Sequence, residues 1–309
     1  MLFSLLILVF ALMLDALLGE PRRWHPLVGF GRLAAALEQA LYGSRPTTPV
    51  QMRAKGVAAL VIAIAPLSIL ACLITWLPGG WLFELIGLYL CLGRHSLRQH
   101  LLAVATPLAE GDLERARSHL GRIVSRDTDS LDQTGIAAAA VESALENGHD
   151  ALFATLFWFL LAGLPGALLH RLANTLDAMW GYRNERYREF GWAAARLDDL
   201  LGWIPARVTA LGYAACGATA VALHAWRTQA EAHDSPNAGP VMAAGAGALE
   251  VRVGGDNLYQ GRLRRRPRFG FGATVSHIDI QRALNLIDRT LLLWLLVVLA
   301  LALAVGSSS

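Results

Sequence analysis

The residues best suited to chemistry lie in the polar stretch from His170 to Arg207, which is bounded by apolar segments. An acid or an arginine at the middle of a membrane-spanning helix costs about 2.5–3.5 kcal/mol even on the lenient insertion scale. Helical spacing (i, i+3) places Asn174 and Asp177 on one face, and it pairs Arg196 with Asp199 in the same way. We therefore predict two polar-faced helices joined by a loop, with their acids and amides directed into a shared site.

A second group of carboxylates lies upstream, where Glu142, Glu146 and Asp150 follow one another at intervals of four residues. On a helix this spacing puts three like charges on one face, where they repel one another. A solvated face tolerates such repulsion, and that interpretation stays open. The alternative is a face that binds Mg²⁺ or performs acid–base chemistry.

A basic cluster, RLRRRPR, occupies 262–268. Basic residues at a membrane surface are attracted to anionic headgroups by about 1 kcal/mol each, and a specific phosphate site is the alternative. The preceding segment, Val251–Gly261 (VRVGGDNLYQG), is predicted to be a glycine-rich loop whose backbone can approach a substrate closely.

The chain that positions these groups is strongly apolar. Of its 309 residues 55% are hydrophobic and only 17% are charged, against roughly 25% in a typical soluble domain. Its net charge of +3 is too small to indicate binding to nucleic acid. The three cysteines lie in apolar segments without metal-ligand spacing, so neither a disulfide scaffold nor a zinc site is predicted.

Long uncharged runs predict an all-α, polytopic integral membrane protein with about four to six apolar helices beside amphipathic and polar-faced helices. We treat residues 1–309 as a single membrane-embedded domain with polar connectors at 19–55, 93–150, 170–207 and 226–289. The predicted apolar helices include Met1–Leu18, Gly56–Leu77, Trp81–Leu92, Val208–Leu223 and Thr290–Val305. In the connector 93–150, Ser130–Gln133 resembles a capping box that opens an alanine-rich helix.

The apolar segment Ala151–Leu169 differs from the others, because Gly163, Pro165 and Gly166 interrupt its second half. Such breaks occur at membrane depth mainly where the backbone packs on protein or lines a cavity. If this segment crossed the bilayer, the polar stretches on either side of it would lie on opposite faces of the membrane, and a site using both would be split. We therefore predict that the segment is re-entrant or otherwise non-spanning.

Seven polar motifs follow one another between Asp15 and about Gly261, which is most of the chain. They are Asp15-xxx-Gly19-Glu20-Pro21 with His25-Pro26; Ser125-Arg126-Asp127-Thr128; Val141-Glu142-Ser143 with Glu146, Asn147 and Asp150; Asn174-Thr175-Leu176-Asp177 with Gly181-Tyr182; Ala195-Arg196 with Asp199, Pro205 and Arg207; Ser235-Pro236-Asn237 with Gly239; and Gly254-Gly255 with Tyr259 and Gly261. Each motif alone is weak, but in this order and spacing they resemble the adenosylcobinamide-phosphate synthase family, membrane-bound proteins of cobalamin biosynthesis. Glu20, His149 and Thr155 depart from the residues more usual in that family.

The resemblance implies an activity, the joining of aminopropanol, free or phosphorylated, to a propionate carboxylate of the corrin ring of adenosylcobyric acid. The product is adenosylcobinamide or its phosphate. Amide formation from a free carboxylate is uphill in water near neutral pH, so ATP is the expected activating agent. An acyl-phosphate route needs Mg²⁺ to neutralise phosphate oxygens, arginine to hold anions, and a base to deprotonate the incoming ammonium.

The motifs supply candidates for each role. The predicted catalytic carboxylates are Glu142, Glu146, Asp150, Asp177 and Asp199, and the last four of these are the candidate Mg²⁺ ligands. The predicted substrate-binding residues are Arg126, Asn147, Asn174, Tyr182, Arg196, Arg207, Ser235, Asn237 and His25, with the arginines as anion clamps. For His25, the alternative is a capping or interfacial histidine.

The expected protein is thus an ATP-dependent, amide-bond-forming ligase in the cell inner membrane. Its expected partners are the corrinoid substrate, aminopropanol or aminopropanol phosphate, and the lipid bilayer, with no nucleic acid and with oligomerisation left open. A non-catalytic inner-membrane sensor of the related β-lactamase-induction family is one alternative, but that family lacks most of these motifs. A transporter is another, because broken helices and acids at membrane depth suit transport.

Overall fold

The computed structural model describes residues 2–21, 25–43, 48–259 and 261–307, without the side chains of Tyr259, Arg262 and Ser307. The chain divides into two compact units, each built from two segments. Unit 1 comprises Met1–Gly93 and Ala154–Gly202, and unit 2 comprises Arg94–Phe153 and Trp203–Ser309.

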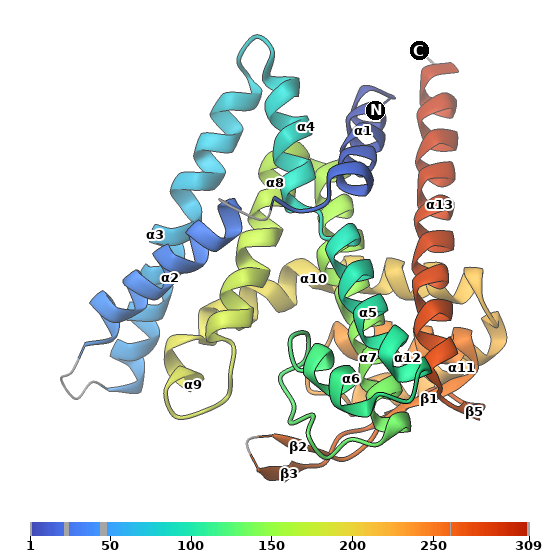
Figure 1. Cartoon of the computed structure of the whole chain (residues 1–309). Helices are drawn as coiled ribbons and strands as arrows, with labels where there is room; N and C mark the ends of the chain where they lie inside the picture. Colours follow the sequence, from blue (N-terminus) through green and yellow to red (C-terminus); the bar gives the residue numbers. More distant parts are fainter. Residues whose placement is uncertain (1, 22–24, 44–47, 260, 308–309) are drawn as a thin grey trace. The chain divides into compact units, whose positions relative to one another are not determined.

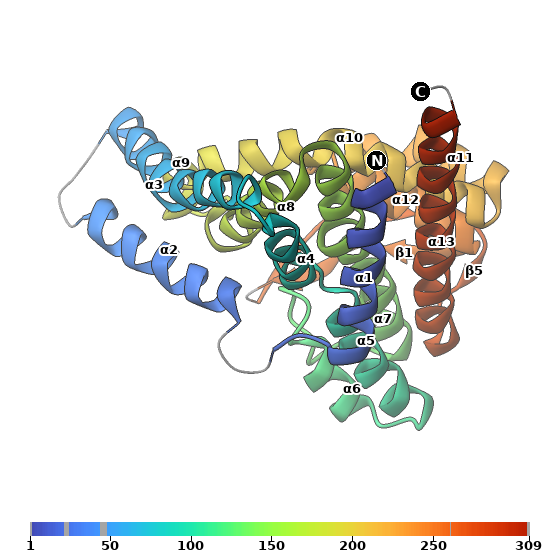
Figure 2. The ribbon, with the colours of Figure 1, turned by 90° about the horizontal axis from the view of Figure 1, so that it is seen from above.

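The described residues of unit 1 form helices and loops. α3 and α4 form a hairpin around a tight turn in which Gly79 has a positive φ of 81° (Figure 1). α8 packs against α2, α3 and α4, while α1 runs beside α4 (Figure 2). The helices of this unit are α1 (Leu2–Leu18), α2 (Pro26–Tyr42), α3 (Pro49–Thr75), α4 (Gly80–Cys91), α8 (Ala154–Trp180), α9 (Tyr187–Phe190) and the first half of α10 (Trp192–Cys216).

α8 consists of two helices that fold back on each other. Ala162 (φ −138°, ψ 18°) and Gly163 (φ 62°, ψ −157°) leave helical geometry. Thr155 Oγ1 and His170 Nδ1 lie 3.5 Å apart, whereas the intervening length of straight helix would separate them by about 22 Å. The predicted break is therefore confirmed, and the re-entrant path through the membrane stays a prediction.

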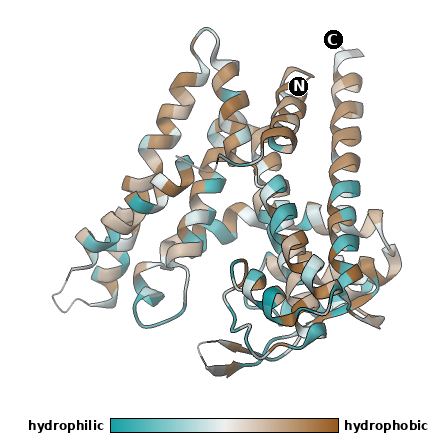
Figure 3. Cartoon of the chain, viewed as in Figure 1, coloured by the Kyte–Doolittle hydropathy of each residue, from teal (hydrophilic) through white to brown (hydrophobic). Residues whose placement is uncertain are grey.

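Unit 2 is built around α7, whose residues are mostly buried, and α12, whose alanine- and glycine-rich sequence is buried throughout. α7 contacts α5, α12 and α13. The C-terminal half of α13 projects from the rest of this unit, and it is hydrophobic along its length (Figures 1 and 3). The helices of unit 2 are α5 (Arg94–Ala109), α6 (Leu113–Leu120), α7 (Gln133–Gly148), the π-helical turn η1 (His149–Phe153), the second half of α10, α11 (Thr219–Gln229), the 3-10 turn η2 (Ala230–Ala232), α12 (Ala238–Leu249) and α13 (His277–Ser307).

The segment expected to be a glycine-rich loop contains strands, so that prediction was wrong in part. Val251 and Val253 are buried while Arg252 between them is exposed, which is the two-residue period of a strand. β1 pairs with β4 antiparallel and with β5 parallel, and β2 and β3 form a hairpin. The strands are β1 (Val251–Gly254), β2 (Asn257–Tyr259), β3 (Arg262–Arg264), β4 (Arg268–Phe269) and β5 (Ala273–Thr274).

Two local predictions are corrected. The predicted apolar helix Val208–Leu223 is divided, because the N–H of Ala218 donates to the carbonyl of Ala248 (2.9 Å) and α10 ends at Cys216. The N-cap of α7 is Asp132, whose carboxylate accepts from the N–H of Gly135 (2.7 Å), and not Ser130.

The described residues include three helical segments long and apolar enough to cross a membrane: Pro49–Thr75, Gln133–Trp180, which contains the fold-back of α8, and His277–Gly306. Two shorter apolar helices, Leu2–Leu18 and Ala238–Leu249, accompany them. The prediction of a helical membrane protein is confirmed.

Candidate functional site

In unit 2 a polar pocket of about 110 Å³ opens beside α7. Two of the three predicted α7 carboxylates, Glu142 and Glu146, line it. The predicted residues Arg126 and Asn147 line it as well, from the loop after α6 and from α7. Its remaining lining residues are Ile123, Val124, Ser125, Ala139, Ser143 and Arg266.

A buried ion pair forms the base of this pocket. Arg126 and Glu142 are 8% and 4% exposed, and the guanidinium Nη2 donates to the carboxylate Oε2. The N–H of Gly254, at the end of β1, donates to the other carboxylate oxygen (2.6 Å). Both oxygens of Glu142 thus have donors, and the carboxylate holds one edge of the Arg126 guanidinium in place.

Asn147 is held by its own helix. Its amide Nδ2 donates to the carbonyl oxygen of Ser143 (2.9 Å) and to the Ser143 hydroxyl (3.0 Å). Because the amide nitrogen is engaged within α7, its orientation at the pocket is set before any ligand binds.

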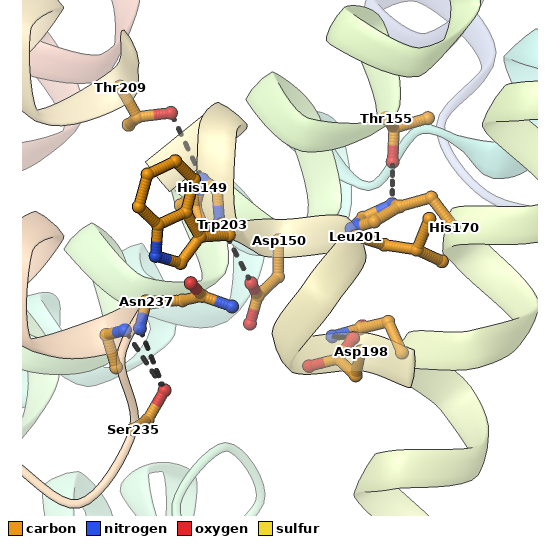
Figure 4. A network of polar contacts seen from close by, with 12 residues as sticks. His149, Asp150, Thr155, His170, Asp198, Leu201, Trp203, Thr209, Ser235 and Asn237 are labelled. Atoms are coloured by element: carbon orange, nitrogen blue, oxygen red, sulfur yellow. Dashed lines mark hydrogen bonds and ion pairs between the residues drawn. The ribbon is translucent and has the colours of Figure 1, made fainter. Parts of the chain in front are cut away.

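A chain of polar contacts continues from the pocket to the start of α12. Arg266 Nη2 lies 2.7 Å from His233 Nε2, and His233 Nδ1 accepts from the N–H of Ser235 (3.0 Å). The Ser235 hydroxyl accepts from the N–H groups of Asn237 and Ala238, which fixes the first turn of α12 (Figure 4). Ser235 and Asn237 thus lie beside one another, and their role in binding substrate stays a prediction.

Arg207 joins this chain from α10. Its Nη1 donates to Asn237 Oδ1 (3.3 Å) and to the carbonyl oxygen of Trp203 (3.0 Å). The guanidinium lies 4.4 Å from the centre of the Trp203 ring, a cation–π contact. The predicted Arg207 and Asn237 thus form one group within unit 2.

Asp150 departs from the predicted row of three carboxylates. The helix widens into the π-helical turn η1 at His149, so the α-helical spacing is lost before Asp150. Asp150 does not line the pocket, and its Oδ1 lies 3.7 Å from the Nε2 of His149. The buried His149 in turn contacts the hydroxyl of Thr209 through Nδ1 (3.1 Å) (Figure 4).

The electrostatics of His233 follow from its position. Burial lowers the pKa of His233, the neighbouring Arg266 lowers it further, and Asp234 and Glu142 oppose the shift. The imidazole is therefore favoured in its neutral form, since protonation would set two cations face to face.

In unit 1 the predicted polar helices do meet. Asn174, on the second half of α8, donates to Asp198 Oδ1 on α10 (3.3 Å). Asp177 and Asp199 on the same two helices repel each other electrostatically. Burial raises the pKa of Asp199, although Arg196 and Arg183 act in the opposite direction.

The remaining predicted residues of unit 1 are more peripheral. Tyr182 is 52% exposed, and Arg196 is exposed as well. His25 is the N-cap of α2 and accepts from the N–H of Leu27 through Nδ1 (3.2 Å), so the capping interpretation is confirmed. Burial lowers the pKa of His25, and Arg171 contributes to the shift while Glu20 opposes it.

Three residues were absent from the predicted site. Arg266 and His233 belong to the chain of polar contacts described above. The charge of Arg171 helps to lower the pKa of His25. Arg171 could have been found, because it lies three residues before Asn174 on the same helical face. No local sequence pattern distinguishes Arg266 from the neighbouring arginines, because the pairing of the strands around it determines which of these side chains reaches the pocket.

The chain was compared with known proteins. The model of the CobD/Cbib protein family matches residues 8–287. A relative from Chromobacterium violaceum, named "Cobalamin biosynthesis protein CobD", is 55% identical over 98% of each chain. Relatives of the same name from Stutzerimonas stutzeri (56% identical, over 94% of this chain and 95% of the relative) and Rhodobacter capsulatus (41%, 92% and 93%) also match. No solved structure matches. With its family-specific motifs in order along a helical membrane protein, this chain belongs to the CobD/Cbib protein family.

Proposed function

We propose that this chain acts in cobalamin biosynthesis as a multi-pass ligase of the cell inner membrane. In the proposed reaction it joins aminopropanol, or its phosphate, to a propionate carboxylate of adenosylcobyric acid. The name shared by the relatives supports the pathway, and the sequence motifs support this step. The observation that carries the proposal is the unit 2 pocket, where Arg126, Arg266, Glu146 and Asn147 combine cationic, acidic and amide groups.

The arginines of the pocket suit an anionic reactant. Arg126 is fixed on one side by Glu142, which leaves its remaining N–H donors for a carboxylate or phosphate. Arg266 supplies a second cation at the pocket lining. A corrin propionate and a transferred phosphoryl group are both anions, so their binding is favoured by these two charges.

The proposed chemistry has two steps. First, a propionate oxygen attacks the γ-phosphorus of ATP, ADP leaves, and an acyl phosphate forms. Second, the amine nitrogen attacks the acyl carbon, the C–N bond forms, and phosphate leaves as the C–O bond breaks. The amine arrives as an ammonium, so one proton must first be removed, and we assign Glu146 as its acceptor because this carboxylate lines the pocket. The nitrogen loses a second proton as the amide forms, and the departing phosphate takes it.

Mg²⁺, when bound, would neutralise phosphate oxygens during phosphoryl transfer. The described residues contain no group of three or more His, Cys, Asp or Glu side chains placed to hold a metal ion. Mg²⁺ is usually bound through one or two carboxylates together with substrate phosphates, so a pocket carboxylate such as Glu146 fits this ion. In unit 2, Glu146 is the residue that would hold it.

The test is a reaction with the detergent-purified chain, adenosylcobyric acid, ATP and Mg²⁺. Parallel samples receive aminopropanol or aminopropanol phosphate, and mass spectrometry detects the amide. We expect product only when ATP is present, together with one ADP per amide. Substrate flux into vesicles without any amide would support a transporter, and the absence of both product and flux would support a sensor.

A further inference from the structure

A second pocket of unit 2 has no part in the proposed reaction. It lies where α13 passes the C-terminal ends of α10 and α12, and its volume is about 130 Å³. Its polar side chains, Arg282, Asn285 and Arg289, all come from α13. The other lining residues are Cys216, Gly217, Ala248, Leu249 and Leu286.

Helix ends normally present unsatisfied carbonyl oxygens that attract cations. Here two of these oxygens already have donors. The carbonyl of Ala248 accepts from the N–H of Ala218 (2.9 Å), and that of Leu249 accepts from Arg282 Nη2 (2.7 Å). Arg282 also pairs with Asp279 (2.6 Å). These donors reduce the negative potential that the end of α12 offers to a cation.

Two donors remain for an anion. Arg289 is exposed and has no carboxylate within ion-pair distance in the part of the chain that the structure describes. The adjacent Asp288 is instead paired with Arg94 and Arg98. Asn285 accepts from Gln281 through its amide oxygen (2.8 Å), which leaves its NH₂ group as a donor. The donors of Arg289 and Asn285 thus make this part of α13 suited to bind an anion.

The same face of α13 continues as an apolar stripe. From Arg282, Asn285 and Arg289, alternating steps of three and four residues lead onward along one side of the helix. The stripe consists of Leu292, Leu296, Leu299 and Leu303, which are 58%, 55%, 38% and 59% exposed. Figure 3 shows the polar start and the hydrophobic continuation of α13.

We propose that this pocket binds the phosphate of an anionic glycerophospholipid whose acyl chains lie along the leucine stripe. From Thr290 to Gly306 the helix carries no charge, and this length of about 25 Å approaches the roughly 30 Å of a bilayer hydrocarbon core. Arg289, one residue before it, lies at the level of lipid phosphates. Basic pockets between helices at this level are suited to anionic headgroups. A soluble phosphate would use the polar end but not the stripe, so the continuity of the face favours the lipid.

The test is native mass spectrometry of the detergent-purified full chain with phosphatidylglycerol and phosphatidylcholine of equal acyl composition. We expect preferential binding of phosphatidylglycerol. Arg289→Gln should weaken it roughly fivefold, the equivalent of ~1 kcal/mol for one basic group. Arg289→Lys, which keeps the charge, should restore most of the affinity. Arg115→Gln, at an arginine whose side chain is 67% exposed on α6, is the matched control and should change nothing.

Three results would overturn the proposal. One is equal binding of the two lipids, which would mean that charge is not recognised. Another is unchanged phosphatidylglycerol affinity in Arg289→Gln. The third is displacement of the lipid by excess inorganic phosphate, which would identify a site for free phosphate instead. Loss of amide-forming activity is not a readout here, so the result is independent of the proposed reaction.

Discussion

At the scale of single residues, the ion pair of Arg126 and Glu142 dominates the candidate site of unit 2. Neither side chain has more than 8% of its surface exposed. Moving both charges out of water is costly, and their attraction offsets that cost only if the geometry is good and further hydrogen bonds are present. The N–H of Gly254 supplies such a bond. We therefore interpret the main role of this ion pair as positioning the Arg126 guanidinium, and not as stabilising the fold.

The first prediction tests that explanation. Glu142→Gln leaves the Arg126 cation buried without its partner, which should destabilise the fold by about 3–5 kcal/mol. Replacing both residues, as Arg126→Gln with Glu142→Gln, should recover part of this loss but no activity. The measurement is the denaturation midpoint in detergent, beside the amide-formation assay. Glu114→Gln, at an exposed position on α6, is the control. Equal destabilisation of the single and double variants would contradict the pairing.

The second prediction concerns pH. The groups around His233 are Arg266, which lies in the segment before β4, Glu142 on α7, and the adjacent residues Asp234 and Ser235. Its folded pKa lies below the ordinary 6.5, so above that pH both folded and unfolded chains hold it neutral. As the pH falls below 6.5, the unfolded chain binds the proton first and stability decreases, by at most about 1.4 kcal/mol per pH unit.

The measurement is the thermal midpoint of wild type and of His233→Asn across this window. Asparagine keeps an acceptor near the N–H of Ser235 but does not titrate. The wild-type midpoint should fall relative to that of the variant as the pH drops below 6.5. Parallel curves for the two proteins would show that His233 is not responsible.

At the scale of elements, the fold-back of α8 depends on a backbone conformation that few residues adopt. Gly163 has φ 62° and ψ −157°, a region almost restricted to glycine. A Cβ at this position would also lie 2.9 Å from Glu84 Oε1. At Gly166 a Cβ would lie 2.6 Å from the carbonyl oxygen of Trp158 in the opposite half of the helix. The two glycines thus have different roles, one in turning the chain and one in close packing.

The third prediction is that Gly163→Ala destabilises the protein by about 1–3 kcal/mol, the usual cost of a residue held in a sparsely populated conformation. Gly29→Ala is the matched control, because a Cβ there meets nothing within 4 Å and the residue lies inside the regular helix α2. The control should be neutral or slightly stabilising, since alanine is the better helix former. Thermal midpoints of the purified variants provide the comparison, and similar midpoints for both would contradict the strained turn.

At the scale of the whole molecule, the predicted catalytic carboxylates fall into both compact units. Glu142, Glu146 and Asp150 belong to unit 2, while Asp177 and Asp199 belong to unit 1. The chain passes from unit 1 to unit 2 after Gly93, returns to unit 1 after Phe153, and enters unit 2 again after Gly202. Each unit therefore contains its own cluster of polar residues, and activity measurements can decide which cluster amide formation requires.

The fourth prediction is that Glu146→Gln and Asp177→Asn each abolish amide formation while membrane insertion stays intact. The reason is that each removes a carboxylate that we assign to proton or metal binding, without adding bulk. Controls are Glu114→Gln in unit 2 and Glu185→Gln in an exposed loop of unit 1. Full activity in Asp177→Asn would remove Asp177 from the catalytic carboxylates, and full activity in both variants would rule out the assignment of Glu146 and Asp177.

Several features of this protein follow from its sequence alone. Apolar runs such as Gly56–Leu77 predict membrane helices, because burial in lipid depends on local hydrophobicity over a helix length. The break at Gly163 is visible in the same way, since glycine and proline act on the backbone where they stand. The ordered polar motifs identify the family, and they include Arg126, Glu142, Glu146 and Asn147, which line the pocket beside α7.

Other features were decided only by the tertiary structure. The carboxylate of Glu142 and the N–H of Gly254 are 112 residues apart in the chain, and no local pattern connects them. Val251–Gly254 becomes a strand because β4 and β5 return to pair with it. α10 ends at Cys216, and the N–H of Ala218 donates to the Ala248 carbonyl instead of continuing the helix. Arg266 likewise joins the site through strand pairing. Hydrophobicity and helical periodicity act over a few residues, whereas pairing partners are chosen by the packing of the whole unit.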